Sequence, residues 1–254
     1  MRLDVALVAR GMARSRNQAA ALITSGQVSV KGLEAPKSSS EVSESTEIKV
    51  TGDLYVARSA GKLSAALYAF EISVPQLCLD IGASTGGFTQ VLLERGAAKV
   101  LAVDVGHNQL ASELREDSRV VNLEGTNVRE LDAAGLGVEP DQIRLTVADL
   151  SFISLTLVVE KFLELAPKAE VVALIKPQFE LQRSRLNKAG VVAQAADRIE
   201  AVTKVGGAFD AIGHGLQHFA PSEVVGSHGN QEYLAHFSPG SVSRISLDEI
   251  QDLI

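Results

Sequence analysis

The segment Leu79–Thr89 reads LDIGASTGGFT and decides the fold of the larger part of this chain. It begins as an apolar run, reaches an acid at Asp80, passes through a turn of small residues and begins a helix at Phe88. A strand, a tight turn and a helix in this order let the backbone approach a nucleoside-bearing cofactor closely. A second acid, Asp104, ends the next apolar run, where a carboxylate can accept both ribose hydroxyls of an adenosine.

Strands and helices are expected to alternate from this segment to the end of the chain. This alternation predicts an α/β fold of Rossmann-like type, with a mainly parallel seven-stranded sheet covered on both faces. The expected strands are 76–81, 99–104, 119–123, 143–149, 170–176, 215–220 and 231–237, and the clearest expected helices are 88–95, 154–165 and 193–211. Ligands of such sheets bind beyond the carboxyl ends of the strands. Four polar residues fall at strand ends: Asp80, Asp104, Asp149 and Lys176.

The first fifty residues follow a different pattern. Two short helices precede short strands at 27–30 and 47–50, which predicts a small α+β module. We therefore expect a first domain at 1–52, a linker at 53–61 and a second domain at 62–254. Residues 1–52 have seven Lys and Arg against five acids, whereas the rest has seventeen against twenty-six. A basic module on an acidic body suggests that the module contacts a polyanion.

The composition argues against a secreted or membrane-spanning protein. Cys78 is the single cysteine and cannot form an internal disulfide, which fits a reducing compartment. The first residues have no apolar signal-peptide region, and no uncharged apolar run is long enough to span a bilayer. We therefore expect a cytoplasmic protein.

The turn itself indicates which nucleoside cofactor fits. A dinucleotide site uses G-x-G-x-x-G, but here the run is Gly82-x-Ser84-x-x-Gly87, without the middle glycine that makes room for a pyrophosphate. This favours S-adenosylmethionine (SAM) over NAD, because acids near the loop can meet the cationic amino-acid tail. Asp80 could meet the ammonium group. An ordinary packing turn is the simpler alternative.

An apolar run at 171–175 brings Lys176 to the edge of a buried strand, where a lysine is desolvated or paired. A lone strand-end acid or lysine is more often a turn residue or a solvated one. For Asp149 and Lys176, however, a match that includes two further residues favours a catalytic role over a structural one. Lys62, Asp149, Lys176 and Glu232 resemble, in order and context, the Lys-Asp-Lys-Glu tetrad of FtsJ-like ribose 2'-O-methyltransferases.

Several longer stretches are similar to the TlyA (hemolysin A) family of rRNA methyltransferases, among them YVARSAGKLSAAL, ADLSFISL, ALIKPQFE and GNQEYLAHF. The resemblance implies a SAM-dependent enzyme that methylates cytidine riboses in ribosomal RNA or ribosomal subunits. Within it, Lys176 would deprotonate or orient the 2'-hydroxyl, and Asp149 and Glu232 would orient the two amines. Ala193-Gln194 departs from the Arg-Asp of the family, and Ser59-Ala60 departs from its glycines; both changes concern substrate placement.

The cofactor site that follows from the turn and from this resemblance is extensive. Phe88 and Thr89 begin a helix whose amides could meet the SAM carboxylate. Asn127 could reach the adenine edge, although a turn asparagine explains it equally well. The expected cofactor-binding residues are Asp80, Gly82, Ser84, Thr85, Gly86, Gly87, Phe88, Thr89, Asp104, Val105, Asn127, Val128 and Asp149. No metal ligand set is expected.

The first module, RLDVALVARGMARSRNQAAALITSGQVSVKG, resembles the small αL-type RNA-binding module shared by a ribosomal protein, pseudouridine synthases and tyrosyl-tRNA synthetases. The resemblance favours phosphate contacts over a merely solvated helix face. The expected RNA-binding residues are Arg2, Arg14, Ser15, Arg16 and Lys31. Two other functions are possible from the sequence: a non-catalytic ribosome-assembly factor, against which the intact tetrad argues, and membrane lysis, against which the missing spanning segment argues.

Overall fold

A computed structural model describes residues 1–254 except 14–15, 25, 34–35, 52–54 and 227–228. The chain divides into two compact units, Met1–Tyr55 and Val56–Ile254. The expected domain boundaries were 52/53 and 61/62. The division lies between Tyr55 and Val56, and the first helix of the second unit already begins at Ser59.

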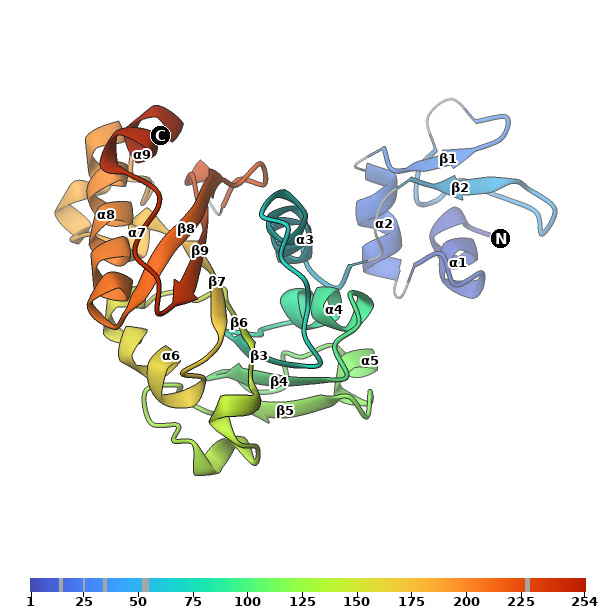
Figure 1. Ribbon diagram of the computed structural model, residues 1–254. Coiled ribbons are helices and arrows are strands. Elements are labelled where there is room, and N and C mark those ends of the chain that lie inside the picture. The colour runs from blue at the N-terminus through green and yellow to red at the C-terminus, as the bar shows by residue number, and fades with distance from the viewer. Residues whose placement is uncertain (14–15, 25, 34–35, 52–54, 227–228) are drawn as a thin grey trace. The chain divides into compact units, whose positions relative to one another are not determined.

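The first unit is a helical hairpin packed on a two-stranded sheet (Figure 1). Helices α1 (Leu3–Ala9) and α2 (Arg16–Thr24) precede antiparallel strands β1 (Val28–Val30) and β2 (Ile48–Val50). Their apolar side chains form a core of their own, which includes Leu3, Leu7, Ile23, Val28 and Ile48. The alternating burial along β1 reflects a sheet with one face on this core.

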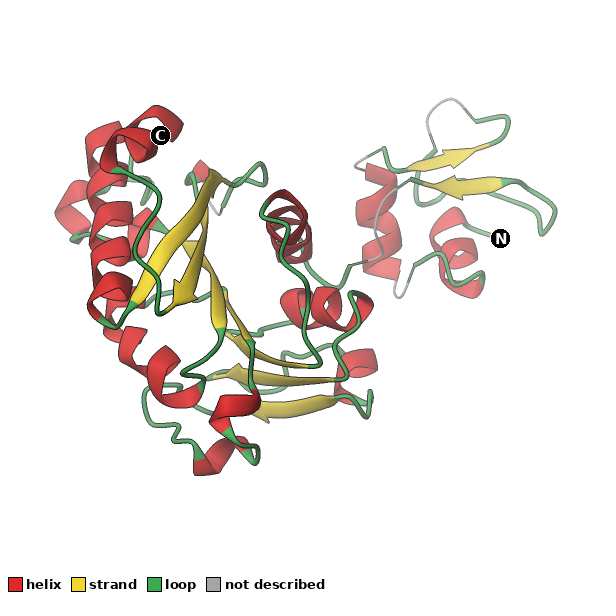
Figure 2. Ribbon diagram, viewed as in Figure 1, coloured by secondary structure: helices red, strands yellow, loops and turns green. Residues whose placement is uncertain are grey.

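The second unit is built on the expected seven-stranded sheet (Figure 2). The strands are β3 (Leu77–Ile81), β4 (Lys99–Asp104), β5 (Val120–Glu124), β6 (Leu145–Ala148), β7 (Glu170–Ile175), β8 (His214–Pro221) and β9 (Tyr233–Pro239). They lie in the order β5-β4-β3-β6-β7-β9-β8, and β9 runs antiparallel to both of its neighbours. The structure therefore confirms the mainly parallel Rossmann-like sheet.

Helices cover both faces of the sheet (Figures 1 and 2). They are α3 (Ser59–Ala69), α4 (Gly87–Glu94), α5 (Ser112–Arg115), α6 (Val159–Leu165), α7 (Pro177–Glu180), α8 (Ala195–Ala211) and α9 (Leu247–Leu253). The core under α6 and α8 is aromatic: the Phe209 ring stacks on Phe237 at 3.9 Å between centroids and meets Phe162 edge-on at 5.3 Å. This aromatic core packs α6 and α8 against the sheet, and the residues of the site lie at the edge of that sheet.

The expected helix at 154–165 is divided in two. A 3-10 turn at Leu155–Leu157 precedes α6, and Val158 between them departs from helical geometry with φ −124°. The Ser154 hydroxyl caps the turn by accepting the Thr156 N–H. Helix α9 was not among the expected helices, although the Ser246–Glu249 pair at its start forms a capping box.

Candidate active site

Polar side chains converge at the carboxyl edge of the sheet for a topological reason. Asp149 directly follows β6, and Lys176 directly follows the neighbouring parallel strand β7. Because β9 is antiparallel to β7, its first residues lie at the same edge, and Glu232 directly precedes it. Lys62 reaches this edge from α3. All four line one cavity of about 330 Å³, which we name the central cavity.

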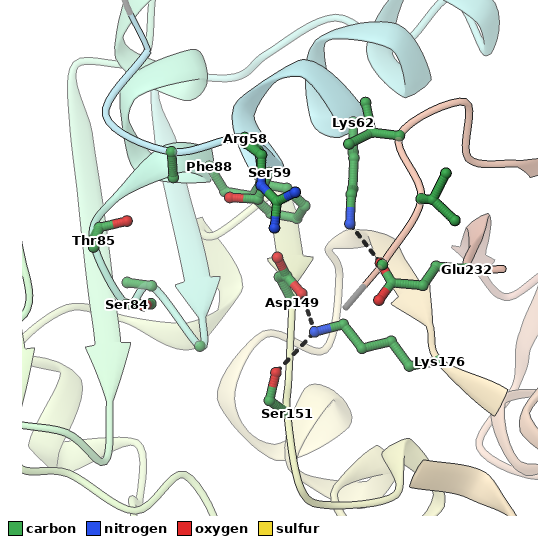
Figure 3. Close-up of a pocket in the computed structure, with 16 residues that line it drawn as sticks. Arg58, Ser59, Lys62, Ser84, Thr85, Phe88, Asp149, Ser151, Lys176 and Glu232 are labelled. Atoms are coloured by element: carbon green, nitrogen blue, oxygen red, sulfur yellow. Dashed lines mark hydrogen bonds and ion pairs between the residues drawn. The ribbon is translucent and has the colours of Figure 1, made fainter. Parts of the chain in front are cut away.

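The four side chains form two ion pairs (Figure 3). Lys62 Nζ lies 2.5 Å from Glu232 Oε2, and Lys176 Nζ lies 2.6 Å from Asp149 Oδ1. Lys176 also donates to the Ser151 hydroxyl at 2.9 Å. Lys62, Lys176 and Glu232 are 8%, 9% and 3% exposed, so these charges are largely withdrawn from water. Each buried amine is thereby balanced by its own carboxylate.

Glycines in the loop between β3 and α4 permit close backbone approach. Gly82 has φ +87°, and a Cβ at this position would lie 2.7 Å from the Asp149 carbonyl oxygen. Gly87 begins α4, and a Cβ there would lie 2.5 Å from the Ser59 hydroxyl of α3. The loop is therefore packed against the segments that carry Asp149 and Lys62.

A second cavity of about 460 Å³ adjoins the central one and shares Gly82, Ser84, Asp149 and Ser151 with it. Nine of the expected cofactor-binding residues line one or both cavities: Gly82, Ser84, Thr85, Phe88, Asp104, Val105, Asn127, Val128 and Asp149. Asp80, Gly86, Gly87 and Thr89 do not line them. Gly86 faces Leu110 and Leu114, and Gly87 faces α3.

Asp80 lies beneath the loop and is fully buried. Its Oδ2 accepts the Thr89 hydroxyl at 2.6 Å, and within the described chain its Oδ1 has no hydrogen-bond partner. Burial raises the pKa of Asp80 to about 7, and the nearby Asp149 and Asp104 carboxylates act in the same direction. Direct contact between Asp80 and a cofactor ammonium stays a prediction, because the carboxyl does not reach either cavity.

Asp104 and Asn127 mark the outer part of the second cavity. The Asp104 carboxylate accepts the Ser84 N–H at 2.8 Å and the Gly106 N–H at 2.7 Å, which fixes its orientation. Asn127 accepts the Arg129 N–H and donates to Glu130, the bonding of a turn asparagine, while it still lines the cavity. Exposed Val105 and buried Val128 add apolar surface beside them.

The described residues of the first unit show how its basic side chains are held. Arg2 and Arg16 both bind the Asp4 carboxylate, and Lys31 lies 3.5 Å from exposed Glu47. Arg10 instead donates to the backbone carbonyls of Thr46, Ser43 and Glu44. The other two expected RNA-binding residues, Arg14 and Ser15, lie outside the described residues.

Comparison with known proteins agrees with this geometry. The family model FtsJ-like methyltransferase matches residues 55–238. The chain belongs to the FtsJ-like methyltransferase family. A second model, the S4 domain, matches residues 1–48. Across the described residues, no helix combines the length and apolar character needed to cross a membrane.

Relatives of this FtsJ-like methyltransferase are similar over nearly its whole length. The 16S/23S rRNA (cytidine-2'-O)-methyltransferase TlyA of Mycobacterium tuberculosis is 43% identical, over 100% of this chain and 95% of that protein. Hemolysin A of Brachyspira hyodysenteriae is 39% identical, over 93% and 99%. A solved structure from Streptococcus thermophilus, described as a hemolysin, has a TM-score of 0.75 and 34% identity, over 100% of this chain and 94% of that one.

S-adenosylmethionine is the cofactor of this FtsJ-like methyltransferase, and the residues of the two cavities fit it. The Asp104 carboxylate, held by two backbone amides, suits the hydroxyls of a ribose. Val105, Val128 and Ile153 line the apolar part of the second cavity and suit an adenine. The carboxylates of Asp104 and Asp149 favour a cation near the Gly82 loop over a pyrophosphate.

Sequence reasoning missed several residues that this methyltransferase places at the site. Arg58, one residue before α3, extends its guanidinium into the central cavity toward Asp149 (Figure 3). Phe152 is 91% exposed and has φ +66°, which is unusual for an aromatic residue. Its ring centroid lies 5.3 Å from that of Phe179. Phe152 lies in ADLSFISL, but left-handed backbone at a phenylalanine has no sequence pattern that would reveal it.

Glu180 was also missed, although it ends the quoted stretch ALIKPQFE. The carboxylate is buried, accepts the Leu155 N–H at 2.9 Å and contacts the Ser154 hydroxyl. Burial raises the pKa of Glu180. The side chain thus links α7, which follows Lys176, to the loop that follows Asp149, so the two segments that carry one ion pair are also tied to each other.

Proposed function

We propose that this chain transfers a methyl group from S-adenosylmethionine to the 2'-hydroxyl of a cytidine ribose in ribosomal RNA. The observation that carries the proposal is the pair of buried ion pairs, Lys62–Glu232 and Lys176–Asp149, around one cavity. The rRNA (cytidine-2'-O)-methyltransferase activity named for the TlyA relative supports the choice of substrate. The matching S4 domain supports an RNA partner.

The cofactor would lie across the two cavities, with its adenosine in the second cavity and its amino-acid tail toward the central one. Asp104 would hold the ribose, and Val105 and Val128 would contact the adenine. Arg58, just before α3, and Ser59, the first residue of α3, border the central cavity and offer donors to a carboxylate. When bound, the cofactor supplies an electrophilic methyl group on a sulfonium.

A third cavity of about 600 Å³ lies beyond Lys176 and offers a place for the target nucleotide. Lys176, Glu232 and Ser151 line both this cavity and the central one, so Lys176 lies at their shared wall. Phe152 and Phe179 line the third cavity and present aromatic faces on which a nucleobase can stack. A ribose entering from this side would bring its hydroxyl to the lysine.

The roles of the four side chains follow from their pairing. Asp149 and Ser151 hold the Lys176 amine in place. Once this amine has released its extra proton to solvent, its neutral form orients the 2'-hydroxyl and accepts the hydroxyl proton as the oxygen takes the methyl group. Glu232 holds Lys62 at the lining of the central cavity, where the second amine contributes positive charge to the site. These assignments use charge and position only, and need no metal ion.

The deciding experiment is to map 2'-O-methylation in rRNA. Ribosomal subunits from a strain lacking this gene are incubated with purified protein and S-adenosylmethionine, and the products are read by mass spectrometry. The intact chain should add methyl groups at cytidine riboses. Lys176→Ala should slow transfer by about a hundredfold or more while S-adenosylmethionine still binds in calorimetry, and exposed Lys99→Ala should act as the intact chain does. Full transfer by Lys176→Ala, or methylation only on bases, would contradict the proposal.

A further inference from the structure

Asp4 is a buried carboxylate that joins the two described arginines of the expected RNA-binding set. It is 4% exposed and belongs to the first turn of α1. Arg2 donates to it through Nε at 3.0 Å and Nη2 at 3.1 Å. Arg16, the first residue of α2, donates through Nε at 3.2 Å and Nη2 at 2.9 Å. One carboxylate therefore fixes guanidinium groups from two separate elements.

The arginines themselves remain at the surface. Their side chains are 49% and 61% exposed, whereas that of Asp4 is 5% exposed. Each guanidinium turns its Nε–Nη2 edge to Asp4, which leaves its Nη1 group and the outer Nη2 hydrogen for other acceptors. The Val5 N–H also donates to Asp4 at 3.0 Å and holds the carboxylate on the helix.

Arg10 shows that the basic residues of this unit are not all equivalent. Its guanidinium donates to three backbone carbonyls of the loop at 43–46, so its donors are used to close that loop. Lys31 faces an exposed glutamate across 3.5 Å, a loose surface pair. Arg2 and Arg16 are instead ordered by a buried anchor and still offer donors to a ligand.

We propose that Asp4 is a positioning residue for RNA binding: it holds Arg2 and Arg16 as one rigid pair that binds the phosphates of an RNA strand. This inference rests on the proposed rRNA substrate. It adds Asp4, a negatively charged residue, to the residues that take part in recognising the RNA. Free arginines lose side-chain entropy when they bind, whereas a pair already fixed by Asp4 loses less. The Arg2 hydrogen bonds hold the pKa of Asp4 well below its usual range, so it stays ionised at physiological pH.

The sign of the effect of Asp4→Asn separates positioning from simple charge. Removing a negative charge from a polyanion-binding surface should strengthen RNA binding and steepen its salt dependence, if only net charge matters. If Asp4 positions the arginines, the same change should weaken binding even though the surface becomes more positive. We expect Asp4→Asn to bind RNA about tenfold more weakly at fixed salt. The slope of log affinity against log salt should become shallower by an amount that corresponds to about one phosphate contact.

The probe is the ribosomal subunit from a strain that lacks this gene, titrated with the full chain at several salt concentrations. Glu47→Gln is the matched control, because it also removes one negative charge from this unit but from an exposed Lys31–Glu47 pair. The control should bind as tightly as the unchanged protein or slightly more tightly. Equal or tighter binding by Asp4→Asn would overturn the proposal.

A second variant keeps the test decisive if Asp4→Asn unfolds the unit, which far-UV circular dichroism would reveal. Arg16→Lys keeps the charge and the Asp4 partner but loses the planar fork, so it should weaken binding while the protein stays folded. Unchanged affinity of Arg16→Lys would also overturn the proposal. If the unchanged protein neither binds nor methylates the subunits, the proposed function fails; if it does both and only the variants behave contrary to expectation, this inference alone fails.

Discussion

Asp149 Oδ1 lies 2.6 Å from Lys176 Nζ, and the two residues join three cavities. Asp149 lines the central and second cavities, and Lys176 lines the central and third ones. Their ion pair therefore lies between the side on which we place the cofactor and the side on which we place the target ribose. A methyl transfer in line from sulfur to oxygen would pass beside this pair.

If the pair acts as a unit, its two residues should not contribute independently. Asp149→Asn and Lys176→Ala should each slow a single turnover at saturating S-adenosylmethionine by about a hundredfold or more, because each disrupts proton transfer. The double variant should be about as slow as the slower single one. Losses that multiply in the double variant would show that the two side chains act separately.

The second ion pair predicts a separation between stability and activity. Glu232→Gln leaves the Lys62 ammonium, 8% exposed, without its anion, and should lower the free energy of unfolding by about 3 kcal/mol. The double variant Lys62→Met/Glu232→Leu removes both charges and should recover most of that stability. It should still transfer no methyl group. Urea unfolding and the rRNA assay measure the two properties.

An active double variant would contradict the role that we assign to Lys62. Glu139→Gln is a suitable control, because Glu139 is exposed and makes no side-chain cap hydrogen bond, so the loss of its charge should change the free energy of unfolding by less than about 0.5 kcal/mol.

Much of this architecture could be predicted because it depends on local patterns. Apolar runs separate the strands from the helices, and the residue that ends each run lies at the sheet edge whatever the rest of the fold does. Asp149 and Lys176 could be placed together on that basis. Glu232 precedes an antiparallel strand, and without the family resemblance its arrival at the same edge requires knowledge of the strand order.

What could not be predicted depends on tertiary contacts. The choice of partners, Lys62 with Glu232 across 170 positions and Lys176 with Asp149, is decided by how α3 packs over the sheet edge. The full burial of Asp80 within β3, where its carboxylate accepts the Thr89 hydroxyl, depends on the packing around that strand, and its expected contact with the cofactor stays a prediction. The break at Val158 likewise occurs inside an apolar pattern that is typical of one helix.

Gly82 provides a test of the close approach between the cofactor loop and Asp149. An alanine at this position would place its Cβ 2.7 Å from the Asp149 carbonyl oxygen, so either the loop or the Asp149 segment must move. Gly82→Ala should therefore weaken S-adenosylmethionine binding by about tenfold or more, the effect of about 1.4 kcal/mol. Isothermal titration calorimetry measures this affinity.

Gly96 is a matched control for Gly82, because it has φ +103° and would place a Cβ in open space. Gly96→Ala should lower the free energy of unfolding by about 1 kcal/mol through backbone strain and leave cofactor affinity unchanged. Equal affinities of the two alanine variants for S-adenosylmethionine would mean that the contact with Asp149 has no part in shaping the site.

Asp80 predicts a characteristic dependence of stability on pH. Its pKa is about 7 in the folded protein and about 3.9 in an unfolded chain. Between these values the folded state keeps a proton that the unfolded state has lost, so the contribution of Asp80 to stability falls as pH rises from about 4 to about 7. The full loss is on the order of 4 kcal/mol and is complete above pH 7.

The pH dependence of Asp80 can be isolated with Asp80→Asn, which does not titrate and can still accept the Thr89 hydroxyl. Burial lowers the pKa of His218, so the contribution of His218 to the stability of the protein rises with pH over part of the same range. Because His218 is present in both proteins, Asp80→Asn and the unchanged protein must be compared at each pH. The unfolding free energy of Asp80→Asn minus that of the unchanged protein should increase from pH 5 to about pH 7 and then stay constant. Parallel stability curves would mean that Asp80 is ionised in the folded protein, and its burial would then require a cationic partner.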